Sequence, residues 1–323
     1  MNLFRLIRLR HFCAVAQHGS VGVAARTLHM SQPALTRSIH KIEQDVGEPL
    51  FERSAAGMGL NATGSALLPY AMAILAEADR GIQEYRNLKG ERRVRLKIGM
   101  SANFGAYILP DVLRPFYNEY PNSQVDVQTG HAEHLMAQLL GAQIDLALLI
   151  SWGGGLDTAV GRTAELLAEK LCRLPAGPYA PASHPLAHRQ DVSLEQLQSQ
   201  QWVIPHGLNI NWIFQGRFTG RGLEPPSQLL TTVSLDLLIS SSLRLGTMTM
   251  LPRHLARSEV EAGRMRPVDC PDLALDYDVA LAMRRRGSRT PAMAYFAQLL
   301  REACNEVADD PGTERRRPRL QSV

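Results

Sequence analysis

The first part of the chain shows apolar residues at the spacing of short amphipathic helices. The steps of three and four residues in two stretches each place the apolar side chains on one helical face. In the first stretch these residues are Leu6, Leu9, Cys13 and Ala16, and in the third they are Leu35, Ile39, Ile42 and Val46. Ser20 and Ser31 stand where capping residues begin the second and third helices, and Pro33 fits the first turn of the third.

The opposite face of the third helix carries hydrogen-bonding side chains, namely Gln32, Thr36, Arg37 and His40. A short helix, a tight turn and a second helix with a polar face form a helix-turn-helix, whose second helix enters the DNA major groove. Glutamine suits adenine edges and arginine suits guanine or phosphate. The same periodicity also fits an ordinary three-helix cluster with a polar outer face.

Two extended pieces follow, near residues 49–53 and 57–60, and they predict a wing with Arg53 facing DNA phosphate or the minor groove.

A longer helix is predicted from Thr63 to about residue 90. Its apolar residues repeat at seven, which is typical of a short coiled coil through which two chains pair. The seam positions are Leu68, Ala71, Leu75, Ala78, Ile82 and Tyr85. Packing of this helix on its own domain is the alternative, and Pro69 predicts a bend near residues 65–69.

Beyond residue 92 the pattern changes to short apolar runs that alternate with helical stretches, which indicates an α/β domain with a mostly parallel sheet. The expected strands are 94–99, 125–129, 145–150, 171–174, 201–204, 230–233 and 279–283, and the expected helices include 105–120, 132–140 and 291–303. Ligands of such sheets bind at the carboxyl ends of strands, near helix N-termini. The residues expected at such a site are Ser101, Ala102, Asn103, Thr129, Gly130, His131, Pro205, His206, Thr247 and Thr249. Hydroxyls at two helix N-termini, together with His131 and His206, predict that the ligand is an organic anion.

Composition adds bounds to this picture. The 323 residues are 45% hydrophobic and 20% charged, which indicates a folded protein of about two domains. Residues 1–45 hold six basic and two acidic residues, so this segment alone matches the net charge of +4 of the whole chain. Four scattered cysteines argue against a disulfide scaffold. The longest apolar stretch, residues 66–76, is too short to cross a membrane, so we expect a cytoplasmic protein without a membrane partner.

The sequence lacks the motifs of common enzymes and cofactor sites. No GxSxG, Walker loop or GxGxxG is present, and His131 and His134 lack a third metal ligand nearby. We therefore expect no catalytic residues, no bound metal and no cofactor. A rival reading is a cytoplasmic small-molecule-binding α/β protein or enzyme whose N-terminal helices serve only protein contacts.

Residues 11–53 resemble the winged helix-turn-helix of the LysR-type transcriptional regulators. The pieces that carry the resemblance are Ala24-Ala25, Leu28-His29, Ser31-Gln32-Pro33-Ala34-Leu35, Ile42-Glu43 and Pro49-Leu50-Phe51-Glu52-Arg53, followed by Leu60-Asn61-Ala62-Thr63-Gly64. Weaker echoes include Asp145-Leu146-Ala147, His184-Pro185-Leu186 and Leu251-Pro252, so the resemblance extends to about residue 304.

This resemblance implies a DNA-binding transcriptional regulator controlled by a small effector. It implies a winged helix-turn-helix over 1–62, a linker helix for dimerisation over 63–91, and an effector-binding domain of periplasmic-binding-protein type over 92–305. That domain would have one subdomain at about 92–161 and 267–305 and another at about 162–266, and a disordered tail would follow over 306–323. The residues implied to contact double-stranded DNA are Ser20, Ser31, Gln32, Pro33, Thr36, Arg37, His40 and Arg53. Dimers would assemble into a homotetramer whose geometry governs the access of RNA polymerase.

Overall fold

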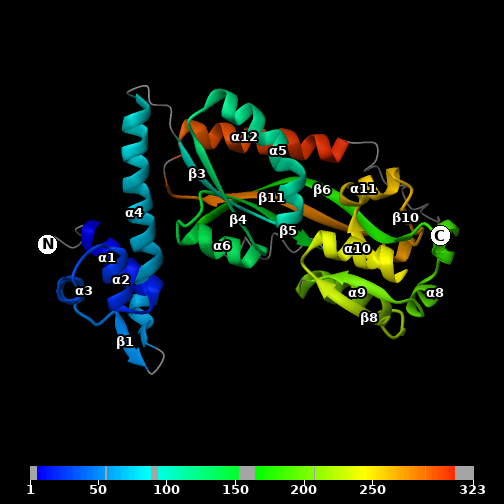
Figure 1. The fold of residues 1–323 in the computed structure, drawn as a ribbon, viewed down its shortest axis with the longest axis horizontal. Helices are drawn as coiled ribbons and strands as arrows, with labels where there is room; N and C mark the ends of the chain where they lie inside the picture. The colour runs from blue at the N-terminus through cyan, green and yellow to red at the C-terminus, as the bar shows by residue number, and fades with distance from the viewer. Residues whose placement is uncertain are drawn as a thin grey trace.

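The computed structural model describes residues 6–54, 57–88, 94–152, 164–206, 208–287 and 289–309. A helical head at the N-terminus, a long helix and a two-lobed α/β domain follow one another along the molecule (Figure 1). This order agrees with the predicted winged helix-turn-helix, linker helix and effector domain. Within the described residues, the structure contains no helix that is long and apolar enough to cross a membrane.

The head consists of three helices and a two-stranded wing. Its elements are α1 Leu6–His18, α2 Val21–Thr27, α3 Gln32–Val46, β1 Phe51–Ser54 and β2 Gly57–Leu60. The predicted face of α3 is confirmed, because Leu35, Ile39 and Ile42 are buried. The face of α1 is rotated from its prediction: Leu6 is 47% exposed, whereas Leu9, Phe12 and Val15 are buried. Phe12 belongs to the buried face of α1 because its ring packs edge-on against that of Phe51 at the start of the wing, with centroids 5.5 Å apart.

The linker helix α4 Ala62–Leu88 runs as one helix across Pro69. Asn61 precedes it, and the Asn61 side chain joins the helix start to the wing by accepting from Gly64 N–H and donating to the Pro49 carbonyl, both at 2.8 Å. Half of the predicted coiled-coil seam packs on the head of the same chain. Ala71 is fully buried there, and Leu68 and Leu75 pack against the head core. The alternative of packing on its own domain is therefore correct for these three positions.

The α/β domain is built on one continuous sheet with the order β4-β3-β5-β11-β6-β9-β7-β8, and β10 pairs with β6. The strands are β3 Arg95–Met100, β4 Gln124–Thr129, β5 Leu146–Trp152, β6 Leu166–Pro181, β7 Trp202–Pro205, β8 Gln228–Thr232, β9 Met248–Pro252, β10 Met265–Pro267 and β11 Leu275–Arg284. The predicted mostly parallel sheet is only partly correct. Strands within each lobe are parallel, but the long strands β6 and β11, which cross between the lobes, make antiparallel pairs.

Helices cover both faces of each lobe. In the first lobe α5 Ala102–Glu119 and α12 Pro291–Asp309 cover one face, and α6 Ala132–Leu140 covers the other. In the second lobe α8 Leu194–Gln198 and α9 Leu208–Thr219 lie opposite α10 Leu235–Leu245 and α11 Arg253–Glu261. Two short 3-10 turns, Pro185–His188 and Pro271–Leu273, complete the second lobe.

Core packing defines the lobes at other positions than the sequence predicts. Leu166 to Ala176 belong to first-lobe cores, whereas Val268 to Leu275 belong to a second-lobe core. The difference arises because β6 is 16 residues long and its first part pairs with β11 before it enters the second lobe. Helix α12 continues through Asp309, past the predicted end of the domain at residue 305. Residues 310–323 of the predicted tail lie outside the described residues.

Candidate DNA-binding and effector sites

The exposed face of α3 carries the residues predicted to contact DNA. Gln32, Pro33, Arg37 and His40 are exposed and Thr36 is half-buried, whereas the opposite face of the helix is in the head core. Ser31 occupies the N-cap position with extended backbone angles, and its hydroxyl makes no capping hydrogen bond. The backbone N–H groups at the start of this 15-residue helix carry a partial positive charge, which suits a phosphate.

Contacts from α1 hold α3 in place. Arg8 Nη1 lies 2.6 Å from Asp45 Oδ2, and His11 Nδ1 lies 2.7 Å from Ser38 Oγ. Burial, with a smaller contribution from Arg10, lowers the pKa of His11, which favours the neutral ring beside Ser38. These contacts assign Arg8 and His11 to the support of α3.

Glu43 links the end of α3 to the wing. Its Oε1 accepts from the Leu50 N–H at 3.0 Å, and its Oε2 lies 3.4 Å from His40 Nδ1. The carboxylate therefore anchors the segment that leads into the wing. It also provides a partner for His40, which is the predicted DNA-contacting residue farthest along the helix.

The wing packs against the turn between α1 and α2. Met58 N–H donates to the Gly19 carbonyl at 2.9 Å, and a Cβ at Gly57 would lie 2.9 Å from the same oxygen. Gly57 has φ +122, a conformation that side chains other than glycine rarely adopt. Arg53 pairs with Met58 in the wing ladder, but its side chain is outside the described part of the chain.

Ser20 performs the capping role that the sequence predicts. It stands at the N-cap of α2, and its Oγ accepts from the Val23 N–H at 3.4 Å. Ser20 is half-buried at the start of α2, and its contact with DNA stays a prediction.

In the first lobe of the α/β domain, two predicted ligand segments lie side by side. Strands β3 and β4 are parallel, with Met100 opposite Thr129, so Ser101 and Gly130 follow at the same edge of the sheet. Ser101 and His131 are the N-caps of α5 and α6, and neither side chain makes a capping hydrogen bond. Two helix N-termini therefore converge there, which is favourable for an anion. Ala102 and Asn103 form the first turn of α5, but their side chains lie outside the described residues.

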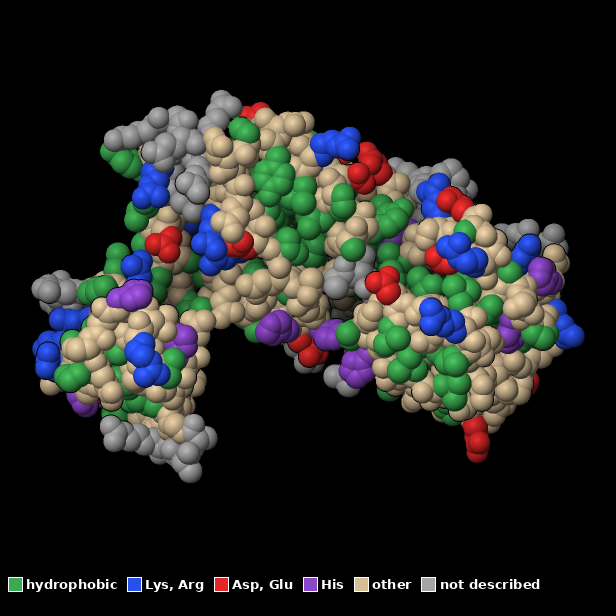
Figure 2. All heavy atoms as spheres, viewed as in Figure 1, with side chains coloured by type: hydrophobic (Ala, Val, Ile, Leu, Met, Phe, Trp, Pro, Cys, Tyr) green, Lys and Arg blue, Asp and Glu red, His purple; other side chains and the backbone are tan. Residues whose placement is uncertain are grey.

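In the second lobe, Pro205 and His206 lie at the end of β7. The His206 side chain is exposed, and the backbone N–H of His206 donates to the Thr232 carbonyl at the end of β8 at 2.7 Å. Figure 2 shows histidine side chains gathered where the two lobes meet. His131 follows β4 in the first lobe and His206 follows β7 in the second, and both side chains are exposed.

Thr247 and Thr249 lie elsewhere. Met248 pairs with Trp202 at the beginning of β7, so Thr247 is at the opposite end of this sheet region from Pro205. Both threonines are buried, at 2% and 0% exposure, and neither hydroxyl has a hydrogen-bond partner among the described residues. The structure therefore does not bring Thr247 to the edge where the other candidates gather, and Thr249 lies within the strand.

Comparisons with known proteins agree with this geometry. The family described as "LysR substrate binding domain" matches residues 89–305, and "Bacterial regulatory helix-turn-helix protein, lysR family" matches residues 6–65. The chain belongs to the LysR family. It is a DNA-binding transcriptional regulator with an effector-binding domain, and the rival reading as an enzyme is not supported.

Similar proteins support the same family over most of the chain. The transcriptional regulator CbbR of Sinorhizobium medicae is 27% identical over 304 residues, which cover 93% of each chain. The uncharacterized regulator YybE of Bacillus subtilis is 28% identical over 61% of this chain and 65% of its own length. A full-length OxyR variant from Pseudomonas aeruginosa has the same fold, with a TM-score of 0.66 and 23% identity over 92% of this chain and 97% of that one.

The structure of this LysR-family regulator also shows a buried aromatic joint that the sequence patterns did not predict. His254 near the start of α11 is 4% exposed, and its ring packs against Phe104 and Tyr107 of α5. The Tyr277 hydroxyl lies 3.3 Å from His254 Nδ1. Burial lowers the pKa of His254 to about 4, so the imidazole is neutral near pH 7. The sequence features that could have indicated this joint are two aromatic residues three positions apart on one helix and a histidine two residues after Pro252.

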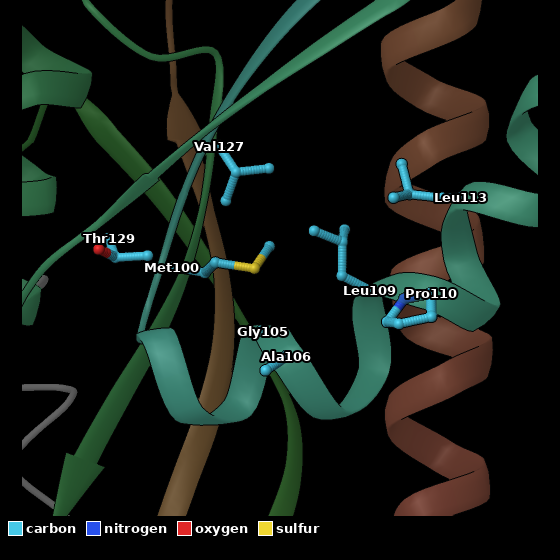
Figure 3. A pocket seen from close by; sticks show the side chains of 8 residues that line it. All are labelled: Met100, Gly105, Ala106, Leu109, Pro110, Leu113, Val127 and Thr129. Carbon is cyan, nitrogen blue, oxygen red and sulfur yellow. The ribbon is translucent and has the colours of Figure 1, made fainter. Parts of the chain in front are cut away.

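An apolar pocket of about 190 Å³ lies in the first lobe, between α5 and the terminal strand β4 (Figure 3). It is lined by Met100, Gly105, Ala106, Leu109, Pro110, Leu113, Val127 and Thr129. Thr129 shares the Val127 side of β4, because alternate residues of a strand point to the same face. Because seven of its eight lining residues are apolar, the pocket is more suitable for an apolar group than for a polar effector.

The described ranges contain no group of three or more His, Cys, Asp or Glu side chains that could hold a metal ion.

Proposed function

We propose that this regulator binds duplex DNA by inserting α3 into the major groove, with the wing and the start of α3 on flanking phosphates. The observation that carries the proposal is the segregation of α3 into a buried apolar face and an exposed face with Gln32, Arg37 and His40. Gln32 would read a base edge, and the Ser31 hydroxyl would contact phosphate. A regulator of chromosomal promoters acts in the cytoplasm, where RNA polymerase gains or loses access according to how these heads bend DNA.

Two chains would pair through the linker helix. Apolar side chains remain exposed on α4 after its packing on the head: Tyr70 is 62%, Ile74 40% and Ile82 53% exposed. These residues lie four and eight positions apart on one helix, as a helix-pairing surface requires. The pairing face would therefore keep Ile82 of the predicted seam and add Tyr70 and Ile74 beside it, since Leu68, Ala71 and Leu75 already contact the head.

Two such dimers would assemble into a tetramer through their α/β domains. Strands β4 and β8 are the two terminal strands of the sheet, and both expose apolar side chains. Val127 on β4 is 40% exposed beside the apolar pocket, while Leu229 on β8 is 48% and Leu237 on α10 is 46% exposed. A two-fold arrangement that places the β4 edge of one chain on the β8 edge of another would cover both surfaces twice.

The effector would be an organic anion held between the lobes. The N-termini of α5 and α6 and the exposed His131 and His206 all favour negative charge. The site would use Ser101, Gly130 and the backbone of Thr129 from the first lobe and Pro205 and His206 from the second. Calorimetry of the full chain with small carboxylates and with matched amides tests this assignment, and binding of the amides alone would contradict it.

DNA recognition is tested by selecting bound sequences from random duplexes and measuring gel shifts on the selected site. We expect Arg37→Ala to weaken retention, while Arg217→Ala, on an exposed arginine of the distant helix α9, should retain the wild-type affinity. Absence of any selected sequence with the wild-type chain would overturn the proposal.

A further inference from the structure

Arg80 of the linker helix makes a buried contact with the effector domain. Its side chain is 10% exposed, and its Nη2 lies 2.7 Å from Oδ1 of Asp145, whose side chain is 15% exposed. Its Nη1 lies 3.1 Å from Glu77 Oε2, one turn earlier on α4. Figure 1 shows α4 standing beside the first lobe, where residue 145 leads into β5. The guanidinium is thus held by one carboxylate of its own helix and one of the α/β domain.

Asp145 is itself held firmly by the sheet. Its Oδ2 accepts from the Lys97 N–H at 2.9 Å, and its own N–H donates to the Lys97 carbonyl at 2.7 Å. The carboxylate therefore bridges the backbone of β3 and the guanidinium of the linker helix. A charge-assisted hydrogen bond to an acceptor that cannot turn is directional, so it restrains the angle of α4 as well as its distance.

A second arginine, Arg284, lies beside this ion pair and binds the backbone on the side of the α/β domain. Arg284 Nη1 donates to the carbonyls of Leu139 and Ile144, at 2.7 and 3.0 Å. Burial, followed by the nearby charge of Arg80, lowers the pKa of Arg284. Two guanidinium groups share this small region, and the carboxylates of Asp145 and Glu77 compensate their charge.

The linker helix makes a second contact with the segment that joins α6 to β5, at a position farther toward its N-terminus. Gln143 Nε2 lies 4.0 Å from the sulfur of Met72, which precedes Arg80 by eight residues, or about 12 Å along a helix. Two contacts at different heights fix the direction of a rod better than either alone. The segment that receives both contacts is short and joins α6 to β5.

We propose that the Arg80–Asp145 ion pair is a positioning device that joins each head and its linker helix to the first lobe as one rigid body. The inference rests on the proposed function, because it concerns how a DNA-binding tetramer sets the distance between its heads. Movement of one lobe against another can change that distance only if the head follows its own lobe. A buried ion pair is suited to this purpose, because its contribution to a unique geometry exceeds its contribution to stability in some proteins.

The test uses the full chain and duplexes with two copies of the selected site. Insertion of five base pairs turns the second copy by about half a helical turn. With rigid heads, one protein can no longer hold both copies, so we expect the wild-type affinity to fall about 100-fold, the usual size of a lost second attachment. Arg80→Met removes the charge and keeps the length of the side chain, and its loss should be below about fivefold because freed heads can follow the rotated site.

Further variants separate coupling from folding. Arg80→Lys should recover most of the spacing dependence, and Asp145→Asn, which keeps an acceptor for Lys97 N–H, should behave as Arg80→Met does. Arg301→Gln removes an arginine paired with Glu169 far along α12 and should match the wild type. All variants should bind a single site within about twofold of the wild type, since α3 is untouched.

The outcomes are distinct. A wild-type spacing dependence that persists in Arg80→Met and Asp145→Asn overturns the positioning role. An equal loss of affinity at every spacing, including the single site, assigns Arg80 to folding alone and also overturns it. Failure of the wild type to prefer any sequence contradicts the proposed function instead.

Discussion

The rings of His254 and Tyr107 lie with their centroids 4.8 Å apart and join α11 of the second lobe to α5 of the first. Phe104 packs edge-on against the same imidazole at 5.5 Å. A buried, neutral histidine therefore lies at the joint between the two lobes, close to the strand ends that form the proposed effector site. Packing of this kind favours one defined angle between the lobes in the absence of ligand.

Acidification should destabilise the protein through His254. The folded pKa is about 4, below the ordinary value of 6.5, so between these values the unfolded state binds more protons and stability falls as the pH falls. The full effect is about 3 kcal/mol between pH 7 and pH 4. Urea unfolding at both pH values, with His254→Gln as the comparison, isolates this contribution because the carboxylates are common to both proteins. Parallel pH dependences in the two proteins would contradict it.

Gly64 should be intolerant of any side chain. A Cβ at this position would lie 2.1 Å from the Leu50 carbonyl oxygen, which is backbone and cannot move aside cheaply. We expect Gly64→Ala to lower the free energy of unfolding by about 3 kcal/mol, at the upper end of overpacking effects, and to separate the wing from α4.

Gly81 on the same helix is the matched control. A Cβ there would meet nothing within 4 Å, so Gly81→Ala should raise stability by about 0.5–1 kcal/mol through helix propensity. Thermal unfolding of the two variants beside the wild type checks both expectations. Destabilisation of the two variants to the same extent would show that the close approach at Leu50 is not the cause.

The elements with strong local signals were predictable from the sequence. The capping role of Ser20, the buried face of α3 and the extent of α6 over 132–140 follow from spacing and turn residues. The pairing of β3 with β4 follows from the rule that consecutive strands joined by a helix lie parallel.

Features set by tertiary contact were not predictable. Strand β9 is a continuous buried stretch without alternation, and its register with β6 and β7 depends on residues far away in the chain. The first half of the predicted seam of α4 was wrong because heptad spacing does not reveal whether Ala71 meets a second chain or the head of the same chain. Its later positions Ile82 and Tyr85 are exposed, and their pairing stays a prediction. His254 was missed because spacing along the chain does not reveal that α11 packs against Phe104 and Tyr107 of α5.

Gln32 should act in sequence recognition without changing the charge of the interface. We expect Gln32→Ala to cost about 1–3 kcal/mol on the selected site and to have little effect on random duplex, as for a residue that reads a base edge. Because no charge is lost, the slope of log affinity against log salt should remain that of the wild type. Arg37→Ala provides the contrast, since loss of a phosphate contact would reduce that slope by about one. Equal weakening on selected and random DNA would remove Gln32 from base readout.

Assembly of the tetramer should depend on the two terminal strands of the sheet. Val127→Lys on β4 and Leu229→Lys on β8 each place a charge on an exposed apolar position, so folding should change by less than about 0.5 kcal/mol. Within an interface the unpaired charge would cost about 2 kcal/mol or more, which raises the tetramer dissociation constant at least about 30-fold.

Sedimentation velocity at several concentrations measures this change. Dimers should persist in both variants, because Tyr70, Ile74 and Ile82 of α4 lie on a different surface. Val260→Lys, an equivalent substitution on the exposed side of α11, should leave the tetramer intact. If Val127→Lys and Leu229→Lys sediment as the wild type does, the terminal strands do not form the contact between dimers, and the apolar pocket beside Val127 needs another occupant.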